Sequence, residues 1–309
     1  MYDSIVRSPS ENLLLSGGLD SSIVCSISRP KKTITIGSSV SAPDLSYAKL
    51  IASKYSEEHT QLILNLDQLL QVIHNAIYIL RTFDPVEIRN SSVLLAAIEH
   101  VKREGGTTIM TGDGADELFA GYNYLLRYYN DVDKLDNELR RLRRIMSFSS
   151  TRIGKKMGIR VMTPFLDKEM VTFADSLDVS AKVGLRNGRI WGKYILRKCY
   201  ESELGVNIAW RTKYAQEQGS GFAAIRDILL RRCSCTDLVN VIDKSGQGPR
   251  IRDTEHLYYF EIYRKYFPLP IEESCTGERC PDCHACLTDN SNYCHTCGCF
   301  PTNRTTTAL

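Results

Sequence analysis

The sequence lacks the features that mark several common protein classes. It has no apolar run long enough to span a membrane, and Met1-Tyr2-Asp3-Ser4 lacks the basic and apolar regions of a signal peptide. Its net charge of +3 is too small to favour a nucleic-acid partner. It also has no internal repeat and no low-complexity tract. We therefore expect a cytoplasmic globular protein with no membrane partner.

Composition and length allow a large core. The 309 residues are 43% hydrophobic and 24% charged, which suits one large domain or two smaller ones. Of the 11 cysteines, seven lie between Cys275 and Cys299. That clustering favours a metal site over a disulfide framework. The other four are expected to be core or surface thiols: Cys25, Cys199, Cys233 and Cys235.

The first motif lies near the N-terminus. Leu13 to Leu15 predict a short buried strand, and Leu19 to Ile27 predict an amphipathic helix. The turn between them presents backbone N–H groups, serine hydroxyls and a helix N-terminus to one point, which is a cradle for phosphates. An ordinary serine- and glycine-rich turn is the alternative. The predicted pyrophosphate-binding residues are Ser16, Gly17, Gly18, Leu19, Asp20, Ser21 and Ser22.

Asp20 decides what kind of phosphate site this is. A carboxylate beside phosphates repels them unless a cation lies between, so Asp20 indicates a magnesium-bound phosphate. The spacing is neither a Walker A loop nor the G-x-G-x-x-G of dinucleotide-binding proteins. It resembles the Ser-Gly-Gly-x-Asp-Ser loop of the ATP pyrophosphatase (PP-loop) families, which split ATP into AMP and pyrophosphate.

Strands and helices alternate along the first part of the chain. This alternation predicts an α/β fold, a doubly wound, Rossmann-like parallel sheet with its ligands at the carboxyl ends of the strands. Asp44 is expected to cap the second helix. The predicted strands are 13–15, 33–37, 59–64 and 107–110, and the predicted helices are 19–27, 45–55, 66–80 and 93–103.

A second motif follows the fourth predicted strand, from Thr111 to Tyr122. Gly112 and Gly114 flank Asp113, and Asp116 and Glu117 open a helix. The helix N-terminus offsets part of this negative charge, and a cation would offset the rest. An acidic helix cap would explain the last two carboxylates but not the two glycines.

The later part of the chain is expected to be mostly helical. The charged segment 131–144 is interpreted as a solvated helix, with a phosphate or partner contact as the alternative. Residues 160–167 are extended, 190–203 form a helix, and 225–266 are helical with a break at 246–249. Three domains result: a core (1–225), a helical extension (226–268) and a Cys-rich tail (269–309) that starts near Pro268 and Pro270.

Two C-x-x-C pairs in this tail have zinc-ribbon spacing. Cys280 and Cys283 precede Cys294 and Cys297 with ten residues between the pairs. Bound zinc would supply folding energy that so short a segment otherwise lacks. A [4Fe–4S] cluster through Cys286 is less favoured. The surplus Cys275, His284, Cys286, His295 and Cys299 leave open a second ion, another ligand set or no ligand role.

The order of motifs resembles the synthetase domain of the asparagine synthetase family over residues 10–225. The matching blocks are Leu-Leu-Ser-Gly-Gly-Leu-Asp-Ser-Ser at 14–22, Ala-Pro-Asp-Leu at 42–45, Ile-Tyr-Ile-Leu-Arg-Thr-Phe-Asp at 77–84, Ile-Arg-Asn-Ser-Ser at 88–92, Thr-Gly-Asp-Gly-Ala-Asp-Glu-Leu-Phe-Ala-Gly-Tyr at 111–122, Val-Met-Thr-Pro-Phe-Leu-Asp at 161–167 and Trp-Arg-Thr-Lys at 210–213. β-Lactam synthetases and peptide-cyclising relatives share weaker versions.

The resemblance implies an AMP-forming amide synthetase that uses ATP and Mg²⁺. A carboxylate, with aspartate favoured, attacks the α-phosphorus of ATP, and ammonia then displaces AMP. Asp20 and Asp116 would hold Mg²⁺, and Lys213 would neutralise charge on the phosphate. Arg211 would be a second phosphate contact, and Asp113 and Glu117 complete the catalytic candidates. The nucleotide pocket would be lined by Leu15, Ile36, Gly37, Thr111 and Gly112.

Two departures from the family affect the substrates. Asp113 stands where asparagine synthetases usually carry Glu, beside the incoming amine, so it could accept a proton. Residue 2 is Tyr2 rather than the glutaminase cysteine, and about a dozen residues precede the phosphate loop. We therefore expect free ammonia, a separate glutaminase subunit or another amine as the nitrogen source, and an oligomer is compatible with the sequence.

Two alternative functions remain at this stage. The enzyme could amidate another carboxylate, such as a sugar acid, a peptide or a carrier-bound acid. It could also be a tRNA-modifying enzyme, because some PP-loop thiolases pair that loop with C-x-x-C ribbons. The weak net charge and the acidic motif at 111–122 disfavour the tRNA-modifying function.

Overall fold

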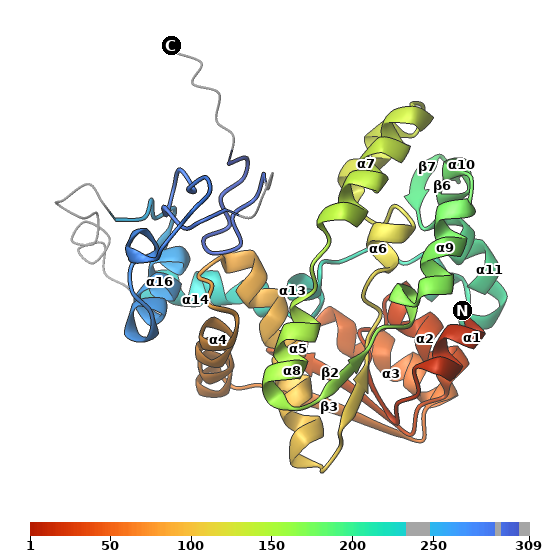
Figure 1. The fold of residues 1–309 in the computed structure, drawn as a ribbon. Helices are drawn as coiled ribbons and strands as arrows, with labels where there is room; N and C mark the ends of the chain where they lie inside the picture. Colours follow the sequence, from red (N-terminus) through yellow and green to blue (C-terminus); the bar gives the residue numbers. More distant parts are fainter. Residues whose placement is uncertain (233–247, 288–291, 303–309) are drawn as a thin grey trace.

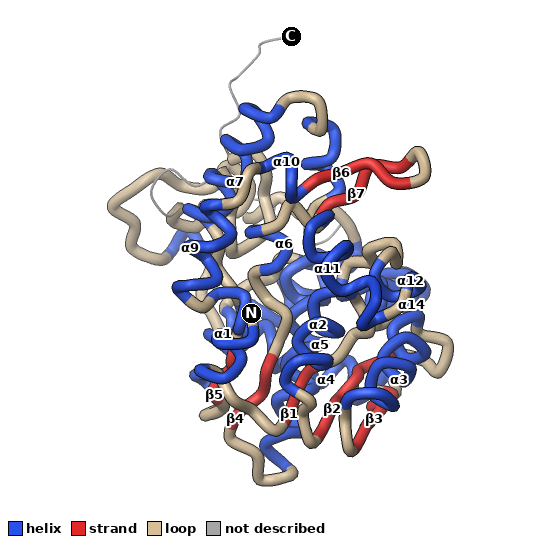
Figure 2. The backbone as a smooth tube through the Cα atoms, turned by 90° about the vertical axis from the view of Figure 1, so that its right-hand side faces the viewer, coloured by secondary structure: helices blue, strands red, loops and turns tan. Residues whose placement is uncertain are grey.

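A five-stranded parallel sheet organises the computed structural model, which describes residues 1–232, 248–287 and 292–302. Figure 2 shows the strands side by side in the order β3-β2-β1-β4-β5. The chain runs outward from β1 to β3 and then returns to β4 on the other side of β1, so the strand order reverses between β1 and β4. Ligands of open α/β sheets bind at such a point. The strands are β1 (Asn12–Leu14), β2 (Lys32–Gly37), β3 (Glu58–Ile63), β4 (Thr108–Met110) and β5 (Arg160–Met162).

Helices cover both faces of the sheet, which confirms the predicted doubly wound α/β fold (Figure 1). One apolar cluster joins Leu13 and Leu15 to α2, α3, α9 and α11. The other joins Ile34, Ile36 and Ile109 to α4, α5, α8 and α16. These helices are α2 (Leu19–Ser28), α3 (Pro43–Tyr55), α4 (Leu66–Leu80), α5 (Pro85–Arg103), α8 (Ser149–Met157), α9 (Lys168–Ser176), α11 (Tyr194–Leu204) and α16 (Thr254–Tyr266).

Shorter segments complete the described chain. In Figure 1, α7 rises away from the sheet. This is the charged segment 131–144, and its exposed ion pairs, such as Arg140 with Asp136, agree with a solvated helix. The remaining helices are α1 (Tyr2–Arg7), α6 (Ala115–Leu118), α7 (Val132–Ile145), α10 (Val179–Lys182), α12 (Val206–Ala209), α13 (Gln216–Gly219) and α14 (Ile225–Arg232), with 3₁₀ turns η1 (Asn123–Tyr128), η2 (Pro164–Leu166), η3 (Phe222–Ala224) and η4 (Pro270–Glu272).

Helix α5 is longer than predicted, and α3 has a different cap. Asp84 accepts a hydrogen bond from the Val86 N–H at 3.1 Å, and Pro85 occupies the first helical position, so α5 starts eight residues before Val93. The prediction that Asp44 caps α3 was wrong, because Ala42 is the N-cap. Asp44 lies in the first turn and instead accepts a hydrogen bond from Arg211 at 2.8 Å. The ion pair with Arg211 therefore replaces the predicted capping role of Asp44.

A hairpin replaces the start of the helix predicted at 190–203. Strands β6 (Val183–Arg186) and β7 (Arg189–Gly192) pair antiparallel, and α11 begins only at Tyr194. Asn187 and Gly188 both have positive φ, at 52° and 73°, as a two-residue hairpin turn requires. The Asn-Gly pair was the sequence signal for this hairpin. The helical spacing of the apolar residues after it led to the wrong boundary.

The Cys-rich tail packs directly on the α/β core. The Phe83 N–H donates to the Thr296 carbonyl at 2.8 Å, and the Thr82 hydroxyl donates to the His295 carbonyl at 2.7 Å. Five tail cysteines share one apolar cluster with α4, α5 and α16: Cys280, Cys283, Cys294, Cys297 and Cys299. Cys233, Cys235 and residues 246–247 of the predicted break at 246–249 lie outside the described residues. No helix among the described residues is long and apolar enough to cross a membrane.

Candidate active site

The loop after β1 is organised by its own serine side chains. The Ser21 hydroxyl accepts from the Ser16 N–H at 3.2 Å, and the Ser16 hydroxyl accepts from the Gly18 N–H at 3.2 Å. Gly17 has φ +64°, and a Cβ there would overlap the backbone of Tyr47 and Ala48. The turn before α2 therefore lies against α3 only because residue 17 is glycine. This arrangement places the N-terminus of α2 at the carboxyl end of β1.

The acidic motif after β4 lies opposite this loop. Gly112 contacts Asp20, since a Cβ at residue 112 would come within 3.0 Å of the Asp20 Cβ. Asp116 begins the short helix α6, and a Cβ on Gly121 would overlap the Asp116 carboxylate. Asp20 and Asp116, which the sequence predicted to hold Mg²⁺, thus follow the adjacent strands β1 and β4. They lie close together at the point where the strand order reverses.

Lys193 joins these two carboxylates and was missed by the sequence analysis. Its ammonium lies 2.5 Å from Asp20 Oδ2 and 2.7 Å from Asp116 Oδ1, and the residue is only 3% exposed. Lys213 also pairs with Asp116 Oδ1. Two carboxylates and two ammonium groups therefore balance one another in a network in which Lys193 is buried and the other three side chains are partly buried. Lys193 was missed because the predicted helix at 190–203 made it an ordinary helical residue. In the structure it precedes α11 and has a left-handed backbone conformation (φ 55°).

Two arginines hold the far side of the site. Arg211 donates to Asp44 and to the Ser16 carbonyl at 3.2 Å, and its guanidinium lies 4.0 Å from the centre of the Tyr47 ring. Arg197 donates to the carbonyls of Gly192 and Arg211 at 2.9 and 3.1 Å. Arg197 therefore supports both the Lys193 loop and Arg211. Two of Arg211's donors serve the fold, so it fixes the phosphate loop in place as well as lining the cleft.

These residues line a cleft of about 660 Å³, which is large enough for a nucleotide. Most of the predicted site residues line it together, whereas Gly17, Ser22 and Gly37 lie behind its walls. Asn90, Glu87, Tyr122, Lys193 and Arg197 line it and were not predicted. The predicted residues on its wall are Leu15, Ser16, Gly18, Leu19, Asp20, Ser21, Ile36, Thr111, Gly112, Asp113, Asp116, Glu117, Arg211 and Lys213.

Burial and neighbouring charge separate the pKa values of the site groups. Burial raises the pKa of Asp113, and its like-charged neighbours Asp116 and Asp20 raise it further. Burial alone would raise the pKa of Asp116, but Lys193 and Lys213 outweigh it and hold that pKa well below its usual range. Burial and the charge of Lys193 lower the pKa of Lys213. Asp116 is thus held as an anion, and Asp113 is a carboxyl suited to exchange a proton.

One oxygen in this network is suited to a divalent cation. Asp20 Oδ1 is buried and has no hydrogen-bond partner among the described residues, which is costly unless a further group binds there. Carboxylate oxygens are the ligands that Mg²⁺ prefers, with nucleotide phosphates supplying others. Asp20 therefore fits a Mg²⁺–ATP complex, although Lys193 already supplies positive charge between Asp20 and Asp116.

Four buried cysteines of the tail form a separate candidate metal centre. Cys280 and Cys297 Sγ lie 3.7 Å apart, Cys283 and Cys294 Sγ lie 3.6 Å apart, and all four Sγ atoms lie within 4.8 Å of one another. A tetrahedral site with Zn–S bonds of about 2.3 Å needs sulfur separations of about 3.8 Å. The geometry fits the predicted zinc ligand set.

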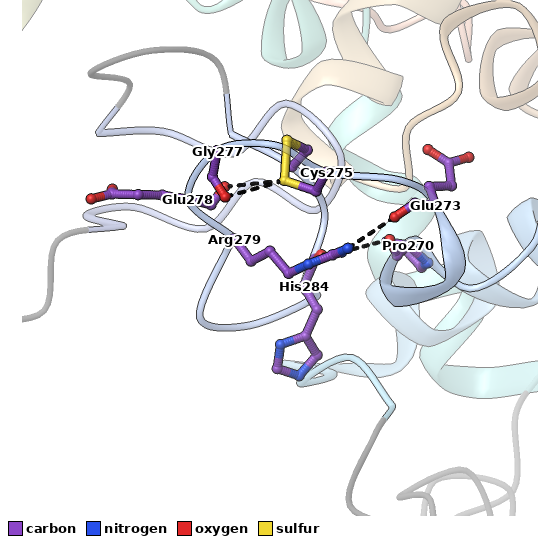
Figure 3. Close-up of a disulfide and its surroundings, with 8 residues drawn as sticks. Pro270, Glu273, Cys275, Gly277, Glu278, Arg279 and His284 are labelled. Carbon is purple, nitrogen blue, oxygen red and sulfur yellow. Dashed lines mark hydrogen bonds between the residues drawn. A yellow bond between two sulfur atoms is a disulfide. The ribbon is translucent and has the colours of Figure 1, made fainter.

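The surplus cysteines of the tail do not join this cluster. Cys275 and Cys286 form a disulfide, so the expectation of a metal site in place of disulfides is corrected for this pair. Figure 3 shows the bond beside Arg279, whose guanidinium donates to the His284 carbonyl at 2.7 Å and to the Glu273 carbonyl at 2.9 Å. With Cys286 engaged there, the C-x-x-C-x-x-C ligand set for an iron–sulfur cluster is not assembled.

Comparison with known proteins gives a consistent assignment. The asparagine synthase family model matches residues 11–153 and 138–240. Asparagine synthetase B [glutamine-hydrolyzing] of Escherichia coli K12 is 27% identical over 286 residues, covering 85% of this chain and 51% of the relative. The Gallus gallus asparagine synthetase is 28% identical over 277 residues, and asparagine synthetase 3 of Arabidopsis thaliana is 28% identical over 280 residues; both alignments cover 48% of the relative. The chain spans about half the length of these curated relatives. This chain belongs to the asparagine synthase family.

Proposed function

We propose that the protein is an AMP-forming amide synthetase that makes asparagine from aspartate, ATP and ammonia. The observation that carries this proposal is the network of Asp20, Asp116, Lys193 and Lys213 between the phosphate loop and the acidic motif. It sets fixed charges of both signs in a nucleotide-sized cleft. Phosphoryl chemistry needs such fixed charges more than it needs a protein nucleophile.

The reaction has two steps. A carboxylate oxygen of aspartate attacks the α-phosphorus of ATP, the bond to the β-phosphate oxygen breaks, and pyrophosphate leaves. Ammonia then attacks the acyl carbon, AMP leaves with the electron pair of the broken C–O bond, and the nitrogen loses a proton. Bound Mg²⁺ would neutralise the phosphate oxygens, and Asp20 is its best-suited ligand here.

The chain's own residues divide the remaining roles. The Ser16–Ser22 loop and the N-terminus of α2 bind pyrophosphate, and Lys213 and Lys193 stabilise charge that develops on it. Asp113 accepts the proton from the attacking nitrogen, because its raised pKa makes it a better base than an ordinary aspartate. Arg211 orients the loop through the Ser16 carbonyl and Asp44. Glu117 accepts a hydrogen bond from Tyr122 at 2.5 Å and forms the wall beside the acyl group.

The source of nitrogen and the metal of the tail are separate parts of the proposal. Ammonia arrives free or from a separate glutaminase subunit. Zn²⁺ binds to Cys280, Cys283, Cys294 and Cys297 and holds the tail on the core. Amidation of a different carboxylate is the second candidate function. It is favoured only by the shorter Asp113 at the position beside the amine.

Pyrophosphate release tests the proposal directly. The assay contains Mg²⁺–ATP, aspartate and ammonium, with controls that omit each component and one in which glutamine replaces ammonium. We expect aspartate-dependent pyrophosphate and asparagine with ammonium, and no response to glutamine alone. ATP-dependent release with another carboxylate but none with aspartate would support the second candidate and refute the first.

A further inference from the structure

The described part of the chain buries two lysines, and they differ in what surrounds them. Lys193 is 3% exposed and lies against the carboxylates of Asp20 and Asp116. Lys182 is 1% exposed, and its ammonium forms no hydrogen bond or ion pair with any described residue. A buried charge without a partner is costly. Lys182 therefore needs a negative charge that the described residues do not supply.

A second cation faces Lys182 from α7. On α7, Arg143 lies one helical turn after Leu139, and on α10, Lys182 lies one turn after Val179. Leu139 and Val179 belong to one apolar cluster, where α7 packs against α10 (Figure 2). Arg143 Nε lies 3.0 Å from Asp175 Oδ1, but its buried Nη1 has no hydrogen-bond partner within the described ranges. Two cations with unused donors thus meet at this helix contact.

The charges around Lys182 do not compensate for its burial. Burial, and after it the positive charge of Arg143, lower the pKa of Lys182 to about 8. The negative charges of Asp175 and Asp136 oppose this shift. Both of these carboxylates already pair with an arginine of α7, at 3.0 and 2.7 Å. The contact between α7 and α10 therefore keeps an excess of positive charge, which an anion would neutralise.

We propose that the contact between α7 and α10 binds a small inorganic anion, held by the Lys182 ammonium and the Arg143 guanidinium. Charged N–H donors of this kind bind chloride or the oxygen atoms of phosphate. Neither residue lines the nucleotide cleft, so the site is separate from the phosphate loop and does not depend on the proposed function. Because β6 begins at Val183, a bound anion would also hold the base of the hairpin that leads to Lys193.

Thermal unfolding of the full chain at constant ionic strength tests this site. Sodium gluconate is replaced stepwise by sodium chloride or by sodium phosphate, so charge screening stays the same while the small anion changes. We expect the Tm to rise and then saturate, by roughly 3–5 °C at an anion concentration 100 times the Kd. A response to both anions indicates a general anion site, and a response to phosphate alone indicates an oxyanion site.

Two variants separate this site from other anion sites, including the phosphate loop. Lys182→Met removes the buried unpaired charge, so its Tm in gluconate should exceed that of the unmodified protein, with no further rise in chloride. Arg143→Met should lose most of the response, because Asp175 is then free to pair with Lys182. This second variant keeps the test valid if Lys182→Met misfolds. Arg144→Met, at an exposed arginine of the same helix, is the control and should respond like the unmodified protein.

Two results would overturn the inference. One is an unmodified protein with the same Tm in gluconate, chloride and phosphate. The other is a full response retained by both Lys182→Met and Arg143→Met, which would assign the anion effect to another part of the protein. A failure of the proposed function is a different outcome, because an absence of aspartate-dependent pyrophosphate release would leave these unfolding curves unchanged.

Discussion

The nucleotide cleft and the Cys-rich tail both gather polar side chains that need compensating charge, and they differ in where that charge comes from. In the cleft, carboxylates from two adjacent strands are neutralised by lysines of the same chain, chiefly Lys193. In the tail, four buried thiols face one another, and a metal ion is the natural source of compensating charge. The cleft is therefore organised by its own fold, whereas the tail centre depends on an added ion.

The two regions also differ in what surrounds them. The cleft rests on a sheet whose two faces each carry a large apolar cluster. The tail has short segments, one disulfide and hydrogen bonds to residues 82–84. The comparison teaches that ion pairs suffice where a large core fixes the backbone, while a small segment needs covalent or metal links. Each variant below tests one side of this difference.

The largest expected effect comes from removing a cleft carboxylate. Asp116→Asn leaves Lys193 and Lys213 without their shared anion, and Asp20→Ala removes the best magnesium ligand. We expect pyrophosphate release to fall roughly 10³-fold in either variant. Asp133→Asn, on the exposed first turn of α7, is the control and should keep full activity. Near-normal release by either cleft variant would refute the assignment of these carboxylates.

Lys193→Met tests whether the ammonium of Lys193 neutralises the carboxylates of Asp20 and Asp116 in the cleft. The change leaves Asp20 without its partner beside the like-charged Asp116, which keeps Lys213, so we expect a loss of about 3 kcal/mol in the free energy of unfolding. Mg²⁺ should restore part of this loss, because a cation can take the place of the ammonium. Denaturant titrations with and without Mg²⁺ measure both effects, with the exposed Lys198→Met as control. A stable variant that is indifferent to Mg²⁺ would contradict the role of Lys193.

Cys280→Ser tests the metal dependence of the tail. The variant should lose its bound zinc and about 3 kcal/mol or more of stability, which corresponds to a fall of roughly 5 °C or more in Tm. The α/β core should stay folded and still bind Mg²⁺–ATP. Metal analysis and thermal unfolding provide the measurements, and Cys199→Ser, an exposed thiol, is the control. Full unfolding at room temperature would instead mean that the core depends on the tail.

The smallest expected effect concerns the disulfide. Cys275→Ser opens a link between residues 11 positions apart, and loop-closure entropy assigns such a link about 2–3 kcal/mol at most. Zinc content should not change, since neither of these cysteines belongs to the four-sulfur cluster. Thermal unfolding with and without reductant should differ in the unmodified protein but not in the variant. A loss of zinc in Cys275→Ser would show that the two parts of the tail are coupled.

Local sequence signals predicted the elements and motifs well where the signal was self-contained. Helix α4 (Leu66–Leu80) begins and ends at the residues that its apolar spacing predicted. The phosphate loop and the four-cysteine set could be predicted because their residues are contiguous or regularly spaced in the sequence. Predictions failed where a distant partner decided the outcome, as for Asp44, which Arg211 engages, and for the hairpin that displaced the start of α11.

The sequence by itself determined the α/β class, the phosphate loop, the acidic turn and the metal-binding spacing, because each depends on neighbouring residues and backbone geometry. Only the tertiary structure decided that Lys193 lies between Asp20 and Asp116, residues 173 and 77 positions away. It also decided that Tyr293 and His295 of the tail line a cavity together with residues of α5 and α8. Charge neutralisation and cavity shape depend on atoms that packing brings together from distant parts of the chain. A local sequence pattern carries no information about the distances between such atoms.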